Sequence, residues 1–423
     1  MEAIPRKRRR IRLGLVAAAT ALAAAAFGCG QAPAPASPAA PTPTAVGTPA
    51  NDATSPTTTS PTTTPSTTTP PTTAAPTTTT TAPSSNGANV GRVGVNTNYY
   101  WFDESTDTAG LQTLAAAGVT WVRDVFDWRT MEPTQGQFNW SGSDALVAAT
   151  AKTGINLLAI LAYSAPWASS DPTGGGNQYY PPKNPSDYAQ FASAVVARYG
   201  PGGTFWATRP DLAVHPLAAV EIWNEPWGYW SWEPNPDPAA YGRLVMAAGP
   251  AIRAADPNVQ IVVAGDDQVV RTDGAIANFV QPMLASNPAI ANYVDAWSVH
   301  PYPDPETNGP QVTSPIEYNY DRVTVTQNET AAAGVSRPIW ITEIGWTTAT
   351  GSSDGVSEAT QAQYVSQALA TALGPWRSFV AKVFLYTWQQ DGTNVSDPQA
   401  HYGLRRADGS MKPAWSAVTS YLQ

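Results

Sequence analysis

The chain has 423 residues with 23 basic and 32 acidic side chains, which gives a formal net charge of −9 at pH 7. Residues 1–28 hold six of the basic residues and one acidic residue, so the rest of the chain carries a formal charge of −14. A body this acidic repels phosphate backbones, which argues against nucleic acid as a partner. Charged residues make up only 13% and aromatic residues 10%, which favours a neutral ligand with apolar faces.

Residues 1–29 predict an export signal. Six basic residues between Arg6 and Arg12 precede an apolar run from Leu13 to Phe27, which has the length of a signal-peptide core and is too short for a comfortable transmembrane helix. The run ends in Ala26-Phe-Gly-Cys29, which resembles a bacterial lipobox. We therefore expect Cys29 to be lipidated, and ordinary signal cleavage followed by secretion is the alternative. Either outcome places the mature chain outside the cytoplasm.

Residues 30–87 form a tract of Pro, Thr, Ser and Ala that contains almost no large apolar side chain. Such a composition cannot bury enough surface to offset the entropy cost of ordering. We interpret it as an extended, Pro-stiffened linker between the signal and a domain that spans residues 88–423.

Metal and disulfide chemistry have few candidate residues. Cys29 is the only cysteine, so no internal disulfide can form. The three histidines, His215, His300 and His401, are scattered without the spacing of a zinc site. We expect no metal and no other cofactor.

After the linker, apolar runs alternate with amphipathic segments, which is the pattern of a parallel β/α fold. Helices are predicted between the runs, for example over Thr108–Ala117 and Pro185–Tyr199. Eight strand–helix pairs favour a closed (β/α)8 barrel over an open doubly wound sheet. The predicted strands are Arg92–Asn96, Thr120–Phe126, Asn156–Ala162, Ala218–Trp223, Gln260–Ala264, Ala296–His300, Pro338–Thr342 and Lys382–Thr387.

Five of these strands change abruptly from apolar to aromatic and ionisable residues at their ends. The carboxyl ends of barrel strands meet on one face, where barrel active sites lie. Buried carboxylates without partners would be very costly, so packing alone does not explain this pattern. The five ends hold Arg123, Asn224-Glu225, His300 with Tyr302, Glu343, and Trp388.

Two glutamates at these ends have the character of a glycosidase pair. Glycoside hydrolysis uses two carboxyl groups that flank the scissile bond, and Glu225 and Glu343 follow the predicted fourth and seventh strands. The sequence here resembles the clan A glycoside hydrolases, whose marks are Asn-Glu-Pro after strand four (Asn224-Glu225-Pro226) and a Glu ending strand seven. The segments from Trp128 to Trp140 and from Tyr402 to Trp415 are similar to members of families 39 and 5.

The resemblance implies that Glu225 is the general acid/base and Glu343 the nucleophile of a retaining hydrolase. A nearby Glu343 charge and a partly apolar pocket should hold Glu225 protonated, while hydrogen bonds keep Glu343 ionised. The expected substrate-binding residues are Arg123 beside Glu343, Asn224 on the sugar 2-hydroxyl, His300 and Tyr302 in the same subsite, and Trp388 as the floor. Glu221, on the strand of Glu225, is expected to form a buried ion pair.

Each of the supporting residues also has a structural interpretation. Arg123 could pair with Asp124 or Asp127, and His300, Tyr302 and Trp388 could be packed side chains. The leading hypothesis is a monomeric, endo-acting hydrolase of a β-linked polysaccharide or oligosaccharide, supported by the many aromatic residues in predicted loops. A glycan-binding protein would lack a carboxylate, an exo-acting enzyme would have a blocked cleft, and a metal-dependent barrel would need ligands. The sugar stays open among glucan, mannan, xylan and galactan.

Overall fold

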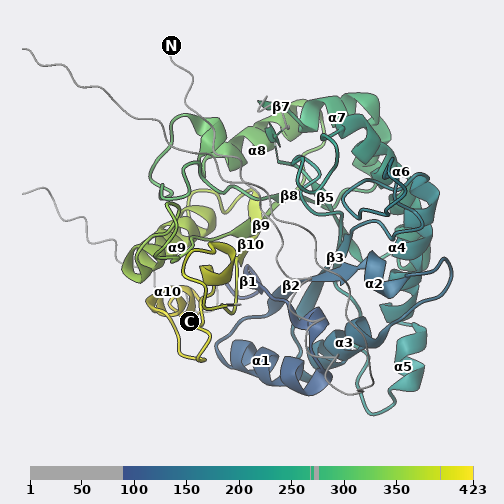
Figure 1. Ribbon diagram of the computed structural model, residues 1–423, viewed down its shortest axis with the longest axis horizontal. Helices are drawn as coiled ribbons and strands as arrows, with labels where there is room; N and C mark the ends of the chain where they lie inside the picture. Colours follow the sequence, from purple (N-terminus) through teal and green to yellow (C-terminus); the bar gives the residue numbers. More distant parts are fainter. Residues whose placement is uncertain (1–88, 267, 271–275, 391, 423) are drawn as a thin grey trace, which may run out of the picture. The chain divides into compact units, whose positions relative to one another are not determined.

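A computed structural model describes residues 89–423 apart from 267, 271–275, 391 and 423. Eight parallel strands close into a barrel in the order β1-β10-β9-β8-β5-β4-β3-β2. The helices form a ring outside the strands (Figure 1). The barrel strands are β1 (Val93–Asn96), β2 (Trp121–Asp127), β3 (Asn156–Ala162), β4 (Ala219–Ile222), β5 (Gln260–Ala264), β8 (Ala296–Val299), β9 (Ile339–Ile344) and β10 (Val380–Leu385).

The connecting helices begin and end at residues that favour such ends. Asp103 caps helix α1 by accepting a hydrogen bond from the Thr106 amide, and α3 ends at Gly154, whose φ of 71° is left-handed. Pro185 occupies the first turn of α4, where its missing N–H costs nothing. The helices are α1 (Glu104–Ala116), α2 (Trp128–Met131), α3 (Ser141–Thr153), α4 (Pro185–Tyr199), α5 (Thr204–Thr208), α6 (Pro238–Ala255), α7 (Val280–Ser286), α8 (Arg322–Ala332), α9 (Glu358–Leu373) and α10 (Pro413–Thr419). Short 3-10 turns lie at Tyr99–Trp101, Pro288–Asn292, Ile316–Tyr318 and Gln399–His401.

The predicted (β/α)8 barrel is confirmed, and each of the eight predicted strands overlaps an observed one. The expected helix over Pro185–Tyr199 has those bounds, whereas the first helix begins at Glu104 rather than Thr108. An antiparallel hairpin of β6 (Gln268–Val270) and β7 (Ile276–Asn278) after the fifth barrel strand was not predicted. None of the helices in the described part of the chain is long and apolar enough to cross a bilayer. The predicted signal, Cys29 and the linker lie outside the described residues.

Large aromatic side chains fill the barrel interior towards the N-terminal ends of the strands. The rings of Trp121 and Trp340 meet edge to face at 5.4 Å, and Phe384 packs beside both. The Lys382 ammonium lies 4.0 Å from the centre of the Trp121 ring and donates to the Gly91 carbonyl at 2.8 Å. This packing closes the base of the barrel, so the open end is the one formed by the C-terminal ends of the strands.

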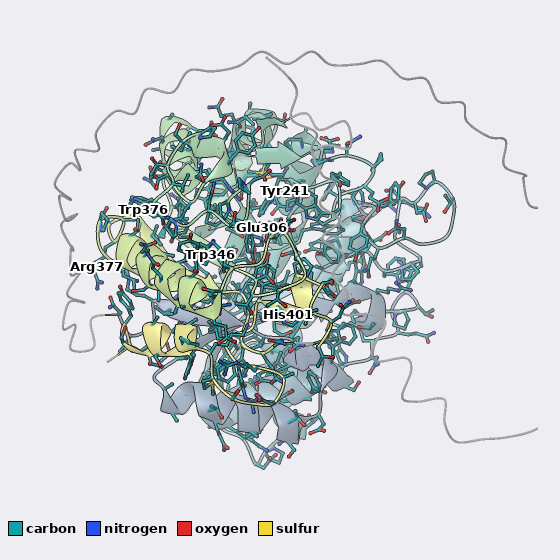
Figure 2. The ribbon with its side chains drawn as sticks, turned by 60° about the vertical axis from the view of Figure 1, so that its left-hand side comes forward. Tyr241, Glu306, Trp346, Trp376, Arg377 and His401 are labelled. Carbon is teal, nitrogen blue, oxygen red and sulfur yellow. The ribbon has the colours of Figure 1, made fainter. Side chains whose placement is uncertain are left out.

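The two ends of the described domain meet on the base side of the barrel. The Asn89 side chain, four residues before β1, donates to the Tyr421 carbonyl at 3.2 Å. Arg377, which precedes β10, donates to the Asn89 side chain at 2.8 Å. Figure 2 labels Arg377 with its neighbour Trp376, whose ring stacks on Tyr320 at 5.1 Å. These contacts tie the entry of the first strand to the end of the chain.

Candidate active site

The turn after β4 is held by tyrosines from two flanking helices. The Tyr188 hydroxyl of α4 donates to the Leu161 carbonyl at 2.6 Å and accepts from the Trp223 amide at 3.1 Å. The Tyr241 hydroxyl of α6 (Figure 2) donates to the Ile222 carbonyl at 2.8 Å and accepts from the Ala264 amide at 2.9 Å. Each hydroxyl thus satisfies backbone groups of two neighbouring strands where their ladder ends.

The same turn contains two residues with left-handed backbone conformation. Trp223 has φ of 65° and Glu225 φ of 49°, which costs non-glycine residues about 1–3 kcal/mol each. Both side chains are buried, and the Trp223 indole donates to the Ser231 carbonyl at 2.9 Å. The turn directs the chain so that consecutive residues Asn224 and Glu225 both reach the polar network at the barrel mouth.

Glu343 lies in β9 at an irregularity of the strand. Val383 and Leu385 of β10 pair with Ile341 and Ile344, so β9 has one more residue than its partner across Glu343. Such a bulge redirects a side chain and is common beside active sites. One Glu343 carboxylate oxygen accepts from Arg123 at 2.6 Å, and the other accepts from the Tyr302 hydroxyl at 3.1 Å.

Arg123 of β2 is the centre of the polar network and is only 1% exposed. Its Nε donates to Glu221 at 2.6 Å, and its terminal nitrogens donate to Asn96 at 2.8 Å and to Asn224 at 2.7 Å, besides the bond to Glu343. Burial alone would lower the pKa of Arg123, but the charges of Glu221 and Glu343 outweigh it and raise this pKa. The expected buried ion pair of Glu221 is confirmed, and Arg123 pairs with the two glutamates rather than with its neighbouring aspartates.

His300 bridges the two glutamates. Its Nδ1 lies 2.9 Å from Glu225 Oε1 and 3.7 Å from Glu343 Oε2. Its Nε2 lies 3.5 Å from an Arg123 nitrogen, and Nδ1 is the ring nitrogen that faces the two carboxylates. With a hydrogen on Nδ1, His300 donates towards both carboxylates. Oxygens of the two glutamates lie within 4.8 Å of each other.

Glu225, His300 and Glu343 are close enough to hold a metal ion, but protein donors already face both carboxylates. Arg123 donates to Glu343, and the Trp230 indole donates to Glu225 Oε2 at 2.6 Å. A metal cation between these residues would be repelled by the positive charge of Arg123. The arrangement therefore suits acid–base and nucleophilic chemistry by the two carboxyl groups better than metal binding.

A buried ion pair supports the segment that holds His300 and Tyr302. Arg322 of α8 pairs with the fully buried Asp266 at 3.2 Å. The same guanidinium donates to the Tyr302 carbonyl at 2.6 Å and to the His300 carbonyl, and Asp266 accepts from the His300 amide at 3.3 Å. The loop after β8 is thus fixed from α8 and β5 before any ligand binds.

The comparisons with known proteins agree with this geometry. Residues 83–379 match the family described as Cellulase (glycosyl hydrolase family 5), which is more than half of the chain. The chain belongs to glycoside hydrolase family 5. It is therefore a clan A glycoside hydrolase, and the mechanism of its family is retaining. No curated protein sequence is significantly similar to this family 5 hydrolase.

Solved structures show the same barrel fold. A family 39 glycoside hydrolase from Bacteroides cellulosilyticus WH2 superposes with a TM-score of 0.58 at 22% identity, covering 78% of this chain and 63% of that one. A GH5_18 enzyme from Streptomyces cattleya, solved in complex with Manβ1-4GlcNAc, superposes with a TM-score of 0.53 at 18% identity, covering 78% of this chain and 80% of that one. The intracellular xylanase TsXylA from Thermoanaerobacterium saccharolyticum superposes with a TM-score of 0.51 at 13% identity, covering 77% of this chain and 94% of that one.

The structure brings six of the seven residues named from the sequence into one network. Arg123, Asn224, Glu225, His300, Tyr302 and Glu343 are joined by the contacts above. Sequence reasoning missed the supporting residues Asn96, Tyr163, Asp266 and Arg322, and it counted Trp230 only among the loop aromatics, not as a partner of Glu225. Of these, Asn96 ends a predicted strand and could have been found by the rule that located Arg123.

The expectation for Trp388 is not met. Trp388 is 1% exposed and its ring packs on Trp415 of α10 at 4.9 Å, so no face is open to a sugar. The observed strand β10 ends at Leu385, two residues before the predicted end, which places Tyr386 at the mouth instead. The half-buried Tyr386 ring lies 6.4 Å from Tyr302 and 5.3 Å from Tyr402.

The loops after β8 and β9 enclose this group of tyrosines. The Tyr402 hydroxyl donates to Glu306, and the Trp346 indole donates to the Asn308 carbonyl at 2.9 Å. Figure 2 labels Glu306 and Trp346, which lie near each other beside helix α9. Glu306, a carboxylate outside the proposed catalytic pair, thus contacts Tyr402, and the Tyr402 ring in turn lies beside Tyr302.

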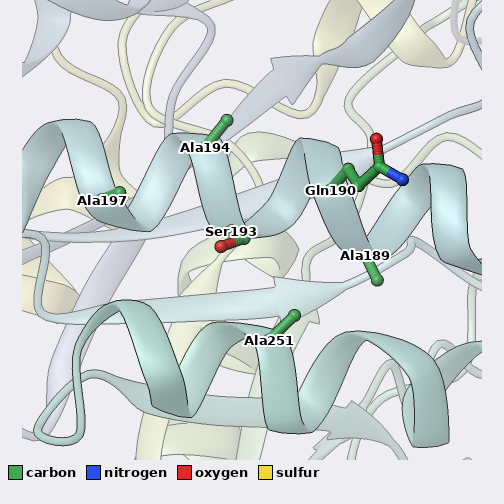
Figure 3. A pocket seen from close by; sticks show the side chains of 6 residues that line it. All are labelled: Ala189, Gln190, Ser193, Ala194, Ala197 and Ala251. Atoms are coloured by element: carbon green, nitrogen blue, oxygen red, sulfur yellow. The ribbon is translucent and has the colours of Figure 1, made fainter.

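A separate hollow lies between α4 and α6 on the outside of the barrel (Figure 3). Its lining residues are small and uncharged: Ala189, Gln190, Ser193, Ala194, Ala197 and Ala251. With no ionisable side chain among them, this hollow has no group for acid–base chemistry.

Proposed function

We propose that the chain is an exported retaining β-glycosidase that cleaves β-linked polysaccharides or oligosaccharides by double displacement. Glu343 acts as the nucleophile and Glu225 as the general acid/base. The observation that carries the proposal is the asymmetric pair of glutamates at the mouth. Their nearest oxygens lie within 4.8 Å, near the carboxyl separation of about 5–5.5 Å of retaining enzymes.

The surroundings of the two glutamates support the division of roles. Glu343 accepts from the permanently charged Arg123 and from Tyr302, so its ionised, nucleophilic form is stabilised. Glu225 lies against N–H groups instead: His300 Nδ1 is 2.9 Å from one of its oxygens, and the Trp230 indole donates to the other at 2.6 Å. The contact with Arg123 suits Glu343 to the nucleophile's role, and Glu225 is then the proton donor of the pair.

The reaction then proceeds in two balanced steps. A Glu343 oxygen attacks the anomeric carbon while the bond to the leaving oxygen breaks, and that oxygen takes the Glu225 proton. Water next attacks the anomeric carbon of the glycosyl-enzyme and gives a proton to ionised Glu225. The bond to Glu343 breaks, both glutamates return to their first state, and the product retains its configuration.

Asn224 and Tyr302 are suited to hold the sugar in the first subsite. The Asn224 side-chain oxygen accepts from Arg123, which fixes its amide nitrogen as the donor. One of its two hydrogens bonds the Tyr163 hydroxyl at 3.0 Å, and the other can donate to a sugar hydroxyl. Burial raises the pKa of Tyr302 well above its usual value, so its hydroxyl stays a donor to Glu343 throughout the working pH range.

We propose an endo-acting cleft because half-buried aromatic rings lie in the loops after several barrel strands. Flat rings stack on sugar faces, and rings on several loops can bind several sugars in a row. A panel of β-glucans, mannans, xylans and galactans with chromatography of the products tests this. Products of mixed length support endo action, and single sugars alone would overturn it. The rings are Trp101, Trp167, Tyr179, Tyr180, Tyr229 and Tyr386.

The proposed location and subunit state have their own tests. Removing residues 1–86 should leave a folded, active monomer, as measured by thermal melting and light scattering, because the linker contributes no core. Cys29→Ser should move the protein from the membrane fraction to the medium. Unchanged fractionation would oppose lipidation.

Chemical rescue tests the catalytic roles. Glu225→Ala should lose about 10²–10⁴-fold on natural substrates but still react with an aryl glycoside that has a good leaving group. Azide should then restore turnover and give the azide product with retained configuration. Glu343→Ala with azide should give the inverted azide product, which proton NMR distinguishes. Inversion by the wild type, or an exchange of the two azide products, would contradict the assignment.

A further inference from the structure

The loop between Glu225 and Trp232 folds back onto the glutamate at its start. The Gly228 amide donates to the Glu225 carbonyl at 3.0 Å, and the Ser231 hydroxyl donates to the same carbonyl. The Trp232 amide in turn donates to the Gly228 carbonyl at 2.9 Å. The loop is therefore a compact turn, and its tip residue Trp230 is half-buried over the glutamate.

Trp230 meets Glu225 through its indole nitrogen. Nε1 lies 2.6 Å from Glu225 Oε2, a distance typical of a hydrogen bond to a charged carboxylate. The placement depends on Gly228, because a Cβ atom there would lie 2.3 Å from the Trp230 ring. The Tyr229 ring also packs against the indole edge to face at 5.3 Å. A specific local structure thus presents the N–H group to the carboxylate.

We propose that Trp230 is a positioning residue that stabilises the ionised form of Glu225, so that it serves the second, hydrolytic half of the reaction more than the first. This inference rests on the proposed acid/base role of Glu225. An indole N–H can only donate, and it therefore favours the charged carboxylate over the neutral acid. Ionised Glu225 is the form that must accept a proton from water.

Other groups that face Glu225 come from five strands. His300 from the end of β8 donates to Oε1, and an oxygen of Glu343 of β9 lies within 4.8 Å of a Glu225 oxygen. Arg123 of β2 contacts Asn224 and His300, which adjoin Glu225, and it also pairs with Glu221 of β4. Tyr163 after β3 and Tyr302 after β8 also interact with its charge. The Trp230 N–H does not titrate, so its hydrogen bond to Glu225 does not depend on the protonation of the indole.

The two half-reactions should respond differently to the loss of this donor. Trp230→Phe keeps a ring in the loop and removes the N–H group. A hydrogen bond to a charged group corresponds to about a tenfold to hundredfold change in equilibrium. With an activated aryl glycoside, glycosylation needs no acid, so kcat/KM should stay near the wild-type value. The hydrolytic step needs ionised Glu225, so kcat should fall by about tenfold or more.

The pH profile gives a second readout that a merely structural role would not change. With an unactivated substrate, kcat/KM requires protonated Glu225, and its basic limb should move to higher pH by about one to two units in Trp230→Phe. Gly228→Ala should also lower kcat without lowering kcat/KM for the aryl glycoside, and it should move the basic limb to the same extent. The reason is that its methyl group displaces the Trp230 ring. Trp206→Phe is the matched control, because Trp206 lies in α5, away from the mouth, and its indole donates to the Gly200 carbonyl at the end of α4.

Intact-protein mass spectrometry during turnover of the aryl glycoside completes the test. The glycosyl-enzyme should accumulate in Trp230→Phe and disappear on addition of azide, which needs no base. If kcat and kcat/KM fall together, or the basic limb does not move while Trp230→Phe melts like the wild type, the role of Trp230 is wrong. If azide fails to rescue Glu225→Ala, the proposed function itself is wrong.

Discussion

Replacement of Arg123 by methionine tests whether one buried cation holds the mouth together. Arg123 is 1% exposed and its partners Glu221 and Glu343 have side chains 3% and 12% exposed. Removing one partner of a buried ion pair costs about 3–5 kcal/mol, because the remaining charge is left uncompensated. For the roughly 335 residues of the domain, an unfolding entropy of about 2.1 cal/mol/K per residue gives about 0.7 kcal/mol/K. Arg123→Met should therefore lower the melting temperature by about 4–7 °C.

A second substitution separates stability from activity. Glu221→Gln in the Arg123→Met background removes the most deeply buried uncompensated charge, and the Ser298 hydroxyl that now donates to Glu221 can bond the amide instead. We expect the double variant to regain at least half of the lost melting temperature in differential scanning calorimetry. Activity should stay about 10²-fold down or more, because Glu343 has lost the group that orients it. A single variant that melts like the wild type, or a double variant that melts no higher than the single one, would refute this reasoning.

Three further substitutions test other features. Burial, with the charges of Asp124, Asp103 and Glu104, raises the pKa of Asp107 to about 8. Between pH 4 and 8 the folded state then holds a proton that the unfolded state has lost. The free energy of unfolding therefore falls by about 1.36 kcal/mol per pH unit in this range. Asp107→Asn should remove this pH dependence, as measured by urea titrations. Burial, with Arg92 nearby, lowers the pKa of Lys382 to about 8. Stability should therefore rise with pH between 8 and 10.5, and an unchanged slope in Lys382→Met would contradict this assignment. Tyr188→Phe should cost about 1–2 kcal/mol and slow catalysis, and an active variant of normal stability would show that the turn at Glu225 does not need its hydroxyl.

The barrel and most of its site were predictable because they depend on local patterns. Buried parallel strands are continuous apolar runs, and a polar residue directly after such a run must lie at the mouth. This rule located Glu225, His300 and Glu343, and Arg123 was found as an ionisable residue after the apolar start of its strand. The structure joins all four in one network. The rule needs no knowledge of how the loops fold.

Residues whose position depends on tertiary contacts were not predictable in this way. Trp230 reaches Glu225 only because two left-handed residues turn the chain and Gly228 makes room for the ring. Trp388 was misplaced because β10 ends at Leu385 and the Trp388 ring packs on Trp415 of α10, a tertiary contact that no local pattern indicates. The Asp266–Arg322 pair joins a strand end to a distant helix, and no sequence spacing indicates it.

The meeting of Asn89 and Tyr421 on the base of the barrel has a practical consequence for handling the enzyme. A fusion partner, affinity tag or solid support joined just before residue 89 or just after residue 421 would attach on the side away from the catalytic opening. Immobilised through either end, the domain would present its mouth to the surrounding solution, where a long polymer could enter it from any direction. Loop insertions after the barrel strands would have the opposite effect, because they would compete with the polymer for the same space.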